Sequence, residues 1–439
     1  MAYDPFSGAL PDFFNNGTRD LLDRWSPLTK WMNERAKAGV DPYTRSTASR
    51  ICPRIEARSR TGQVVRGVNF ASQDYLSLAS HPRVIDAASQ AARDLGVHSA
   101  GSVALMGLTE KTLELELERR IAEFVATADA IVFPTGWGAG YGVIKTLIQP
   151  SDHVVIDVLA HACLQEGAAN STDNVHRFQH CSADGVEKKL RRIRRNDPDA
   201  GILVVTESVF SMDSDTPDIA TLQGLADEYG ATLLVDVAHD LGAMGPTGRG
   251  QLELQGMLGK VGLVMGSFSK TFASNGGFVA CNHPALKLAL RLSSGPSTFS
   301  NAISPMQAAV VLECLDIISG PEGETLRSQL AENITRVRRS MLNVGLDVLG
   351  TPSPIVPVIL GDNRKSRLVT SRALSDGLLV NLVEFPAVAR NACRWRLQVM
   401  AGHEAEDIDR LASITSEVVA WASAESRPLV TTSAADDFL

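Results

Sequence analysis

Short continuous apolar runs alternate with stretches of helical periodicity through the middle of the chain. From the apolar runs we predict strands at 130–133, 154–157, 175–178, 202–206, 232–236, 263–267 and 278–281. Helices are predicted between most of them, at 139–148, 185–195 and 219–229. Strands that are apolar on both faces and alternate with helices are typical of a mainly parallel sheet covered on both sides. The pattern therefore predicts an α/β fold with a mainly parallel, seven-stranded sheet.

The two ends of the chain follow different patterns. An amphipathic helix is predicted at 18–38, with Leu21, Leu22, Trp25, Leu28, Trp31 and Met32 on one side. After Pro284, helices are predicted at 285–292, 305–318, 326–344 and 405–424, and short strands at 346–349, 355–360, 378–382 and 394–400. This second pattern predicts a smaller α+β domain. We expect an N-terminal arm and helix at 1–65, a large domain at 66–300, a small C-terminal domain at 301–425 and a disordered tail at 426–439.

The composition narrows the possible functions. The 439 residues carry a formal net charge of −8, which argues against a general nucleic-acid binder, because such proteins show a basic stripe. The six cysteines are scattered without a CxxC pair. We therefore expect neither a disulfide framework nor a metal site, and a reducing compartment such as the cytoplasm fits best. The acidic N-terminus does not resemble a signal peptide, and no apolar run approaches the length of a membrane span.

Two residues at the ends of predicted strands indicate a cofactor. Asp236 ends the strand 232–236, and Lys270 follows the strand 263–267. Ligands collect at the carboxyl ends of strands in open α/β sheets. Pyridoxal phosphate (PLP) needs a lysine for its Schiff base and an acid that keeps its pyridine nitrogen protonated. Taken singly, the lysine could lie on the surface and the acid could cap a helix, and His239 could pack in the core rather than beside a cofactor.

The loop 133–140 lies between a strand and a helix and is rich in small residues. Thr135, Gly136 and Trp137 lie where this helix begins, and free N–H groups together with the helix dipole favour a phosphate there. The loop has neither a Walker lysine nor a GxGxxG pattern, so nucleotide binding is weakly supported. His161 lies just beyond another predicted strand, where an imidazole could stack on a planar ring.

Arg396 lies inside an apolar strand segment. Burying an arginine is costly unless an anion pairs with it, and a substrate carboxylate matches a guanidinium through two hydrogen bonds. A structural salt bridge is the alternative. The hydroxyl of Ser267, near Lys270, could bind a phosphate, and Gly276 and Gly277 would let the backbone pass close to a ligand.

Three motifs resemble those of a known family. They are TESVFSMD at 206–213, LLVDVAHDLGAMGPTGRG at 233–250, and GSFSKTF at 266–272 followed by GGF. Over roughly residues 65–420 the chain resembles the α-oxoamine synthases, which have PLP fold type I, the aspartate aminotransferase-like fold. The family includes serine palmitoyltransferase, 8-amino-7-oxononanoate synthase, 2-amino-3-ketobutyrate CoA ligase, 5-aminolevulinate synthase and a quorum-sensing autoinducer synthase. Its members are homodimers with active sites at the interface, so the resemblance implies a homodimer.

The resemblance implies catalytic and cofactor-binding roles. Lys270 would carry PLP and remove the α-proton of the amino acid. Asp236 would pair with the pyridine nitrogen, and His239 would lie near the phenolic oxygen of the cofactor. His161 would stack on the ring.

The resemblance implies phosphate and substrate contacts as well. Thr135, Gly136 and Trp137 match the phosphate loop, Ser267 matches a phosphate-binding hydroxyl, and Ser300 matches a hydroxyl that reaches the phosphate in the neighbouring subunit. Arg396 matches the arginine that holds the carboxylate of the amino acid. Asp74 and Tyr75 are the other substrate-binding residues that we predict.

The implied reaction joins an amino acid to an acyl thioester, releases the thiol and CO₂, and yields an α-amino ketone. L-Serine and a long-chain acyl-CoA are the substrates we expect first. Alanine, glycine or 2-aminobutyrate and an acyl carrier protein donor remain alternatives, as do an aminotransferase, a lyase and a non-catalytic partner subunit, although Lys270 argues against the last. The sequence departs from the common family pattern at Val103, Thr112, Pro134, Gly140, Val237 and Asp240.

Overall fold

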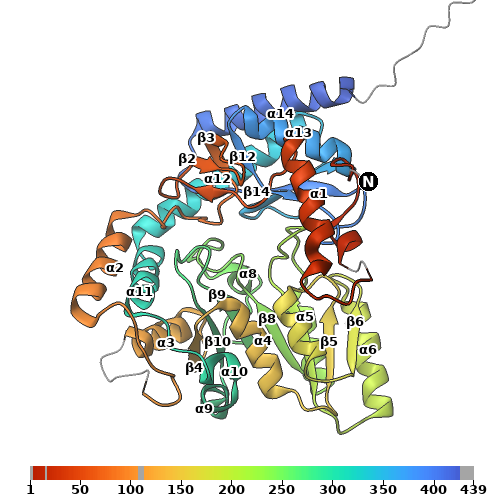
Figure 1. Cartoon of the computed structure of the whole chain (residues 1–439). Helices are drawn as coiled ribbons and strands as arrows, with labels where there is room; N and C mark the ends of the chain where they lie inside the picture. The colour runs from red at the N-terminus through yellow and green to blue at the C-terminus, as the bar shows by residue number, and fades with distance from the viewer. Residues whose placement is uncertain (1–2, 15–16, 107–112, 426–439) are drawn as a thin grey trace, which may run out of the picture.

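A seven-stranded sheet forms the centre of the larger layer of the molecule (Figure 1). The computed structural model describes residues 3–14, 17–106 and 113–425, so Thr112 and the predicted tail 426–439 lie outside it. The strands are β4 (Asp129–Phe133), β5 (His153–Asp157), β6 (Val175–Phe178), β7 (Ile202–Glu207), β8 (Thr232–Asp236), β9 (Leu263–Ser267) and β10 (Gly277–Cys281). Their order is β4-β10-β9-β8-β7-β5-β6, and β10 alone among them runs antiparallel to its neighbours. The predicted, mainly parallel sheet is confirmed.

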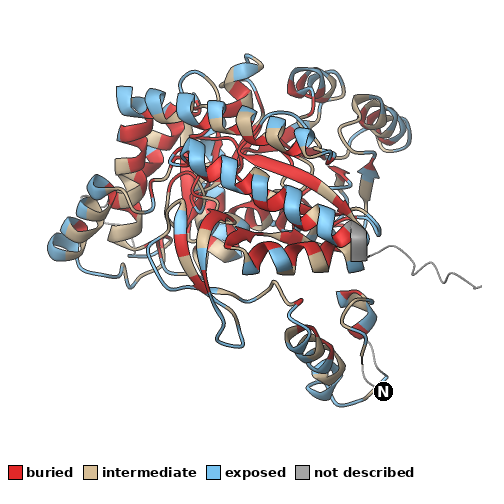
Figure 2. Cartoon of the chain, turned by 90° about the horizontal axis from the view of Figure 1, so that it is seen from above, coloured by how far each residue is buried: buried red, intermediate tan, exposed pale blue. Residues whose placement is uncertain are grey.

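Helices cover both faces of this sheet. They are α2 (Pro82–Leu95), α3 (Leu113–Phe124), α4 (Gly136–Leu147), α5 (Ala162–Ala169), α6 (Ala183–Asn196), α7 (Ile219–Glu228), α8 (Gly250–Leu254), α9 (Pro284–Ser293), α10 (Gly295–Thr298) and α11 (Pro305–Ser319). Successive strand residues point to opposite faces. Val154 and Ile156 therefore pack in one core with α4 and α5, whereas Val155 packs in the other core with α6 and α7. Figure 2 shows buried residues along the strands and exposed residues on the outer faces of helices.

Residues from both ends of the chain build the smaller layer. A sheet of β1 (Ser46–Thr47), β2 (Arg54–Arg58), β3 (Val64–Phe70) and β12 (Leu378–Val380) forms because β12 pairs in parallel with β3. A three-stranded sheet has the order β11 (Ile355–Gly361), β14 (Cys393–Gln398), β13 (Leu382–Val383). The helices here are α12 (Pro321–Asn343), α13 (Asn363–Ser375) and α14 (Ala405–Glu425). Among the described residues, no helix combines the length and apolar character that crossing a membrane requires.

Three sequence predictions are wrong in detail. The strand predicted at 378–382 is two short strands, β12 and β13, which belong to different sheets. The helix predicted at 18–38 is α1 (Ser26–Lys37), preceded by a short 3-10 turn at Asp23–Trp25; a proline in the first turn of α1 suits a helix start. The strand predicted at 346–349 is only a single bridge between Val348 and Val358. This segment lies between Gly345 and Gly350, which have φ values of 88° and 65° and so turn the chain at each end.

Candidate active site

A cavity of about 270 Å³ lies at the carboxyl ends of β7, β8 and β9. It is lined by Thr135, Gly136, Trp137, His161, Cys163, Glu207, Asp236, Ala238, His239, Met265, Ser267, Ser269, Lys270, Asn275 and Gly276. Parallel strands place their carboxyl ends at one edge of the sheet. Most of the predicted cofactor-binding residues therefore meet in one place, although they are spread along the sequence.

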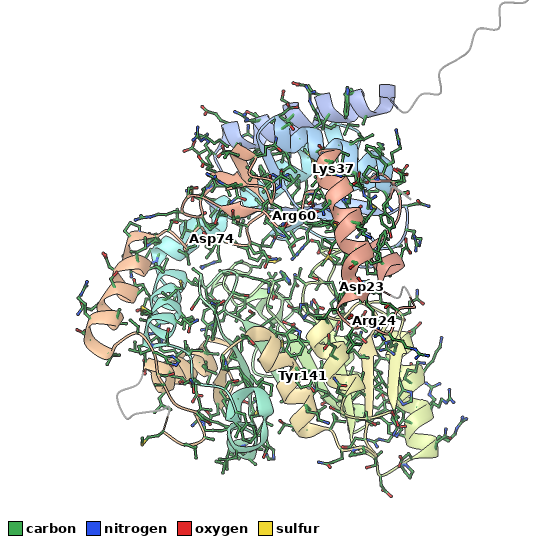
Figure 3. The ribbon with its side chains drawn as sticks, viewed as in Figure 1. Asp23, Arg24, Lys37, Arg60, Asp74 and Tyr141 are labelled. Atoms are coloured by element: carbon green, nitrogen blue, oxygen red, sulfur yellow. The ribbon has the colours of Figure 1, made fainter. Side chains whose placement is uncertain are left out.

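An adjoining cavity of about 450 Å³ shares Ser269, Lys270 and Asn275 with the first. Its other lining residues include Gln73 and Asp74, and Figure 3 labels Asp74 on the side of the molecule that carries α2 and α11. Lys270 thus lines both cavities. The predicted residue Ser300 follows α10 and is not among the lining residues of either cavity.

The loop before α4 has the features of an anion cradle. Thr135 caps the helix, and its Oγ1 accepts a hydrogen bond from the N–H of Gly138 at 2.9 Å. A Cβ atom at Gly136 would collide with the hydroxyl of Ser267, so the close approach of loop and strand requires glycine. The Ser267 hydroxyl also lies 2.8 Å from that of Ser269. Hydroxyls beside the N-terminus of a helix suit the phosphate of PLP.

Asp236 and Glu207 are buried carboxyls at neighbouring strand ends, where they stand opposite each other in the β7–β8 register. Burial raises the pKa of Asp236, whereas the charges of Lys270 and His161 act in the opposite direction and lower it. Asp236 Oδ1 accepts the N–H of Ala238 at 2.9 Å. Burial also raises the pKa of Glu207 well above its usual value, and its Oε1 accepts the N–H of His161 at 2.6 Å. These contacts hold both carboxyls in place below the cavity.

Burial shifts the lysine and the two histidines of the site toward their neutral forms. Burial lowers the pKa of Lys270, although Asp236 opposes the effect. Burial also lowers the pKa of His161 and holds that of His239 well below its usual value. His239 Nδ1 lies 2.9 Å from the hydroxyl of the buried Tyr75. A neutral lysine is the form that acts as a nucleophile and as a base.

His161 caps the N-terminus of α5 and is held at its Nδ1 atom. That atom accepts the N–H of Cys163 at 3.3 Å and lies 3.1 Å from Cys163 Sγ. With Nδ1 as the acceptor, the neutral ring carries its proton on Nε2. Cys163, which also lines the cavity, was not among the residues predicted for the site, although it follows His161 by two positions.

Arg396 lies on β14, and its buried Nε has no hydrogen-bond partner within the described chain. With the amide of Gln73 oriented toward the guanidinium, the Gln73 oxygen accepts from Nη2 at 3.1 Å and from Nη1 at 3.3 Å. A buried donor without a partner is costly, and a bound carboxylate would satisfy it. Asp74, next to Gln73, accepts the N–H groups of Leu78 and Ala79, and burial raises its pKa to about 6.

Asp240, one of the positions where the sequence departs from the pattern of the family that it resembles, is fully buried. Its Oδ1 accepts the hydroxyl of Ser208 at 2.6 Å, and its Oδ2 accepts the N–H of Gln251 at 2.6 Å. Ser208 is also bound to Asp236, because its backbone N–H donates to the carbonyl of Asp236 at 2.8 Å. Asp240 therefore fastens the first turn of α8 to Ser208, at the end of β7.

We expect Asp240→Asn to stabilise the protein more at about pH 8 than at about pH 5. Burial raises the pKa of Asp240 to about 7. A carboxyl whose folded pKa is raised costs stability as the pH rises from its unfolded pKa, about 3.9, through its folded pKa. Asparagine has no such titration, and its amide can accept from Gln251 and donate to Ser208. Thermal unfolding of both proteins across this pH range measures the effect, and a Tm difference that does not change with pH would contradict it.

Comparison with known proteins identifies the family. The family model for aminotransferase class I and II matches residues 65–414. The 8-amino-7-oxononanoate synthase of Geobacter metallireducens is 34% identical over 80% of this chain and 88% of its own length. The serine palmitoyltransferase of Sphingobacterium spiritivorum is 33% identical over 85% of this chain and 92% of its own. The solved serine palmitoyltransferase of Sphingomonas wittichii superposes with a TM-score of 0.85 at 28% identity, covering 92% of this chain and 99% of that structure.

Fold and site define a PLP-dependent enzyme of fold type I. A solved serine palmitoyltransferase that contains PLP matches with the same TM-score of 0.85 at 29% identity. The chain belongs to the α-oxoamine synthases, within the class I and II aminotransferase family. Its cofactor is PLP, and its activity is that of a PLP-dependent acyltransferase.

Proposed function

We propose that the protein joins L-serine to a long-chain acyl-CoA, releases CoA and CO₂, and forms an α-amino ketone. The observation that carries this proposal is the position of Lys270, which lines both central cavities. Asp236 lines one of them, and the other is lined by Gln73, which accepts hydrogen bonds from Arg396. One base thus faces a cofactor site and a site for an amino-acid carboxylate. The structural relatives named serine palmitoyltransferase support serine and a long chain as the first substrates to test.

Several residues would hold the cofactor. The helix start at Gly136, with the hydroxyls of Thr135 and Ser267, would bind the phosphate, and Asp236 would bind the pyridine nitrogen. His161 would cover the ring, and His239, oriented by Tyr75, would donate a hydrogen bond from its Nε2–H to the phenolic oxygen. Bound PLP supplies an electron sink that stabilises negative charge at the α-carbon of the amino acid.

The remaining steps belong to side chains of this protein. Arg396 would bind the amino-acid carboxylate through its fork of N–H groups and so set the direction of the α-carbon. Lys270, whose pKa is lowered by burial, would remove the α-proton with its Nζ atom. His161, with its proton on Nε2, would donate a hydrogen bond into the cavity and orient the reacting groups.

A thiol-release assay tests this function. Serine, alanine, glycine and 2-aminobutyrate would each be combined with CoA thioesters of short and long chains. We expect the fastest release with serine and a long chain. Fastest release with alanine, glycine or 2-aminobutyrate would instead favour the alternative of a family member like the 8-amino-7-oxononanoate synthases, which the sequence relatives support equally. Transfer of the amino group to a keto acid, with no thiol release, would overturn the proposal.

We also propose that the protein is a homodimer, with Ser300 reaching the phosphate site of the partner. Leu105 and Phe299 are 88% and 89% exposed. Their loops are joined by the bridge between Ser102 and Asn301 and by the hydrogen bond from Ser102 Oγ to the carbonyl of Thr298 at 2.5 Å. Large exposed apolar side chains on joined loops are typical of an interaction surface.

The paired substitution Leu105→Asp and Phe299→Asp should separate the dimer, because it places two like charges in each copy of an apolar interface. Sedimentation should show twice the chain mass for the natural protein and the mass of one chain for the variant. Leu342→Asp, at a position on α12 that is 56% exposed, is the matched control and should remain dimeric. A natural protein that sediments as a monomer would contradict the proposal.

A further inference from the structure

An apolar cavity of about 420 Å³ lies apart from the two cavities at Lys270, between α1 and the edge strand β13. Its lining residues are Ala9, Leu10, Leu28, Trp31, Met32, Arg35, Tyr43, Arg367, Leu382, Val383, Glu384, Phe385, Pro386 and Ala387. Most of these side chains are apolar, and the volume falls within the range of about 300–1,000 Å³ typical of small-molecule sites.

The polar residues of this cavity satisfy one another. Glu384 accepts hydrogen bonds from Arg35 Nη2 at 3.0 Å, Arg367 Nε at 2.6 Å and the Tyr43 hydroxyl at 2.5 Å. The other nitrogens of Arg367 donate to backbone carbonyls in the segment 5–8, and Arg35 also donates to the carbonyl of residue 40. None of these four side chains has a buried unpartnered polar atom within the described chain. The cavity therefore offers an apolar ligand a surface but offers a carboxylate no free donor.

The wall of this cavity comes close to the proposed carboxylate site. In the β13–β14 register, Val383 stands opposite Arg394, and the carbonyl of Asn381 accepts the N–H of Arg396 at 2.9 Å. Val383 is thus the diagonal neighbour of Arg396 on the same face of the sheet. Diagonal neighbours have Cα atoms about 7–8 Å apart, within reach of a long side chain.

The opposite wall, α1, is held firmly. Arg60 donates to Asn33 Oδ1 at 2.9 Å and to the carbonyl of Met32 at 2.8 Å, and Figure 3 labels Arg60 beside the helix that ends at Lys37. Trp31 stacks on Phe13 with ring centroids 4.6 Å apart. Figure 1 shows α1 in front of the smaller layer, with its first turn toward α5. The cavity therefore has two ordered walls, one of which leads to Arg396.

We propose that this cavity binds the acyl chain of the thioester substrate, and that the chain is a plain hydrocarbon without a terminal carboxylate. The inference rests on the proposed function and specifies its acyl substrate. Each methylene that the cavity buries should strengthen binding roughly fourfold. A chain that ends in a carboxylate would bury a charge without a partner, because Arg35 and Arg367 already bind Glu384.

Unreactive CoA thioethers test the assignment with the PLP-loaded protein. Calorimetry would compare a hexadecyl thioether, an octyl thioether and an octyl analogue that ends in a carboxylate. We expect the hexadecyl compound to bind at least tenfold more tightly than the octyl compound, and the carboxylated analogue most weakly, by the same methylene and charge arguments. A carboxylated analogue that binds as tightly as the octyl compound would overturn the proposal.

Two substitutions test whether the acyl chain lies in this cavity. Leu28→Phe and Met32→Phe fill the cavity and should weaken hexadecyl binding about tenfold or more, because several methylenes lose their place. Leu342→Phe, on α12 and outside the cavity lining, is the matched control and should bind as the natural protein does. Circular dichroism would establish that all three variants fold. Hexadecyl binding should also change the fluorescence of the natural protein, and Trp31→Phe should abolish that change.

The outcomes separate this proposal from the proposed function. A protein that releases thiol from acyl-CoA, yet binds the hexadecyl thioether equally well in Leu28→Phe and Met32→Phe, would overturn the cavity assignment alone. A protein that releases no thiol from any acyl-CoA would overturn the function itself.

Discussion

Lys270→Ala should lower kcat by about 10²–10⁴-fold, the contribution of a positioned general base, and loss of the covalent link to PLP should deepen the effect. Lys270 is the lysine at the carboxyl end of β9 and lines both central cavities. Its burial favours the neutral amine, which both roles require. Steady-state thiol release measures the loss, and the visible absorbance of the protein-bound cofactor reports its attachment.

Two controls give this result its meaning. Lys270→Arg keeps a positive charge but cannot form the imine link to PLP, so it should be nearly as inactive as the alanine variant. Lys37→Ala removes an exposed lysine at the end of α1 and should leave kcat unchanged. Turnover of Lys270→Ala at the natural rate would remove Lys270 from the mechanism.

Arg396→Ala should raise the KM for the amino acid and reduce kcat/KM by roughly 30- to 4,000-fold. This range corresponds to the about 2–5 kcal/mol lost when one partner of a buried, hydrogen-bonded charge pair is removed. Arg396 has a buried Nε without a partner in the described chain, and Gln73 accepts from its two terminal nitrogens. Kinetics at varied amino-acid concentration, with the acyl thioester saturating, measure the effect.

The lysine variant at the same position separates charge from geometry. Arg396→Lys keeps the charge but loses the two-pronged contact, so its kcat/KM should lie between those of the alanine variant and the natural protein. A parallel effect on cofactor absorbance is not expected, because Arg396 does not line the cavity of Asp236. A variant with natural KM for the amino acid would assign the carboxylate to another residue.

The pattern of apolar positions was sufficient to predict every strand of the large sheet, because all of them except the edge strand β6 are mostly buried on both faces and therefore form nearly continuous apolar runs. It did not predict the strand order, nor that β3 pairs with β12. The apolar pattern indicates which faces of a strand are buried, but not which strands pair with one another. The segment 346–349 was misassigned because an apolar run between two glycines satisfies the same pattern as a strand.

The residues of the candidate site were likewise predictable only in part. Lys270, Asp236 and the loop at Gly136 could be recognised in the sequence because each follows or ends a strand and carries the chemistry that PLP needs. Glu207, Cys163 and Gln73 were not identified as site residues, although Glu207 lies within the motif at 206–213 and has the same strand-end signal as Asp236.

The sequence by itself determined the fold class, the family and the cofactor, because these depend on local periodicity and on short motifs. Only the tertiary structure decided which side chains touch. Tyr75 and His239 are 164 positions apart, and Arg35 and Glu384 are 349 apart, yet each pair shares a hydrogen bond. Such contacts arise from the packing of whole layers, and no local pattern encodes them. For the same reason the apolar cavity beside α1, built from the two ends of the chain, became visible only in the folded protein.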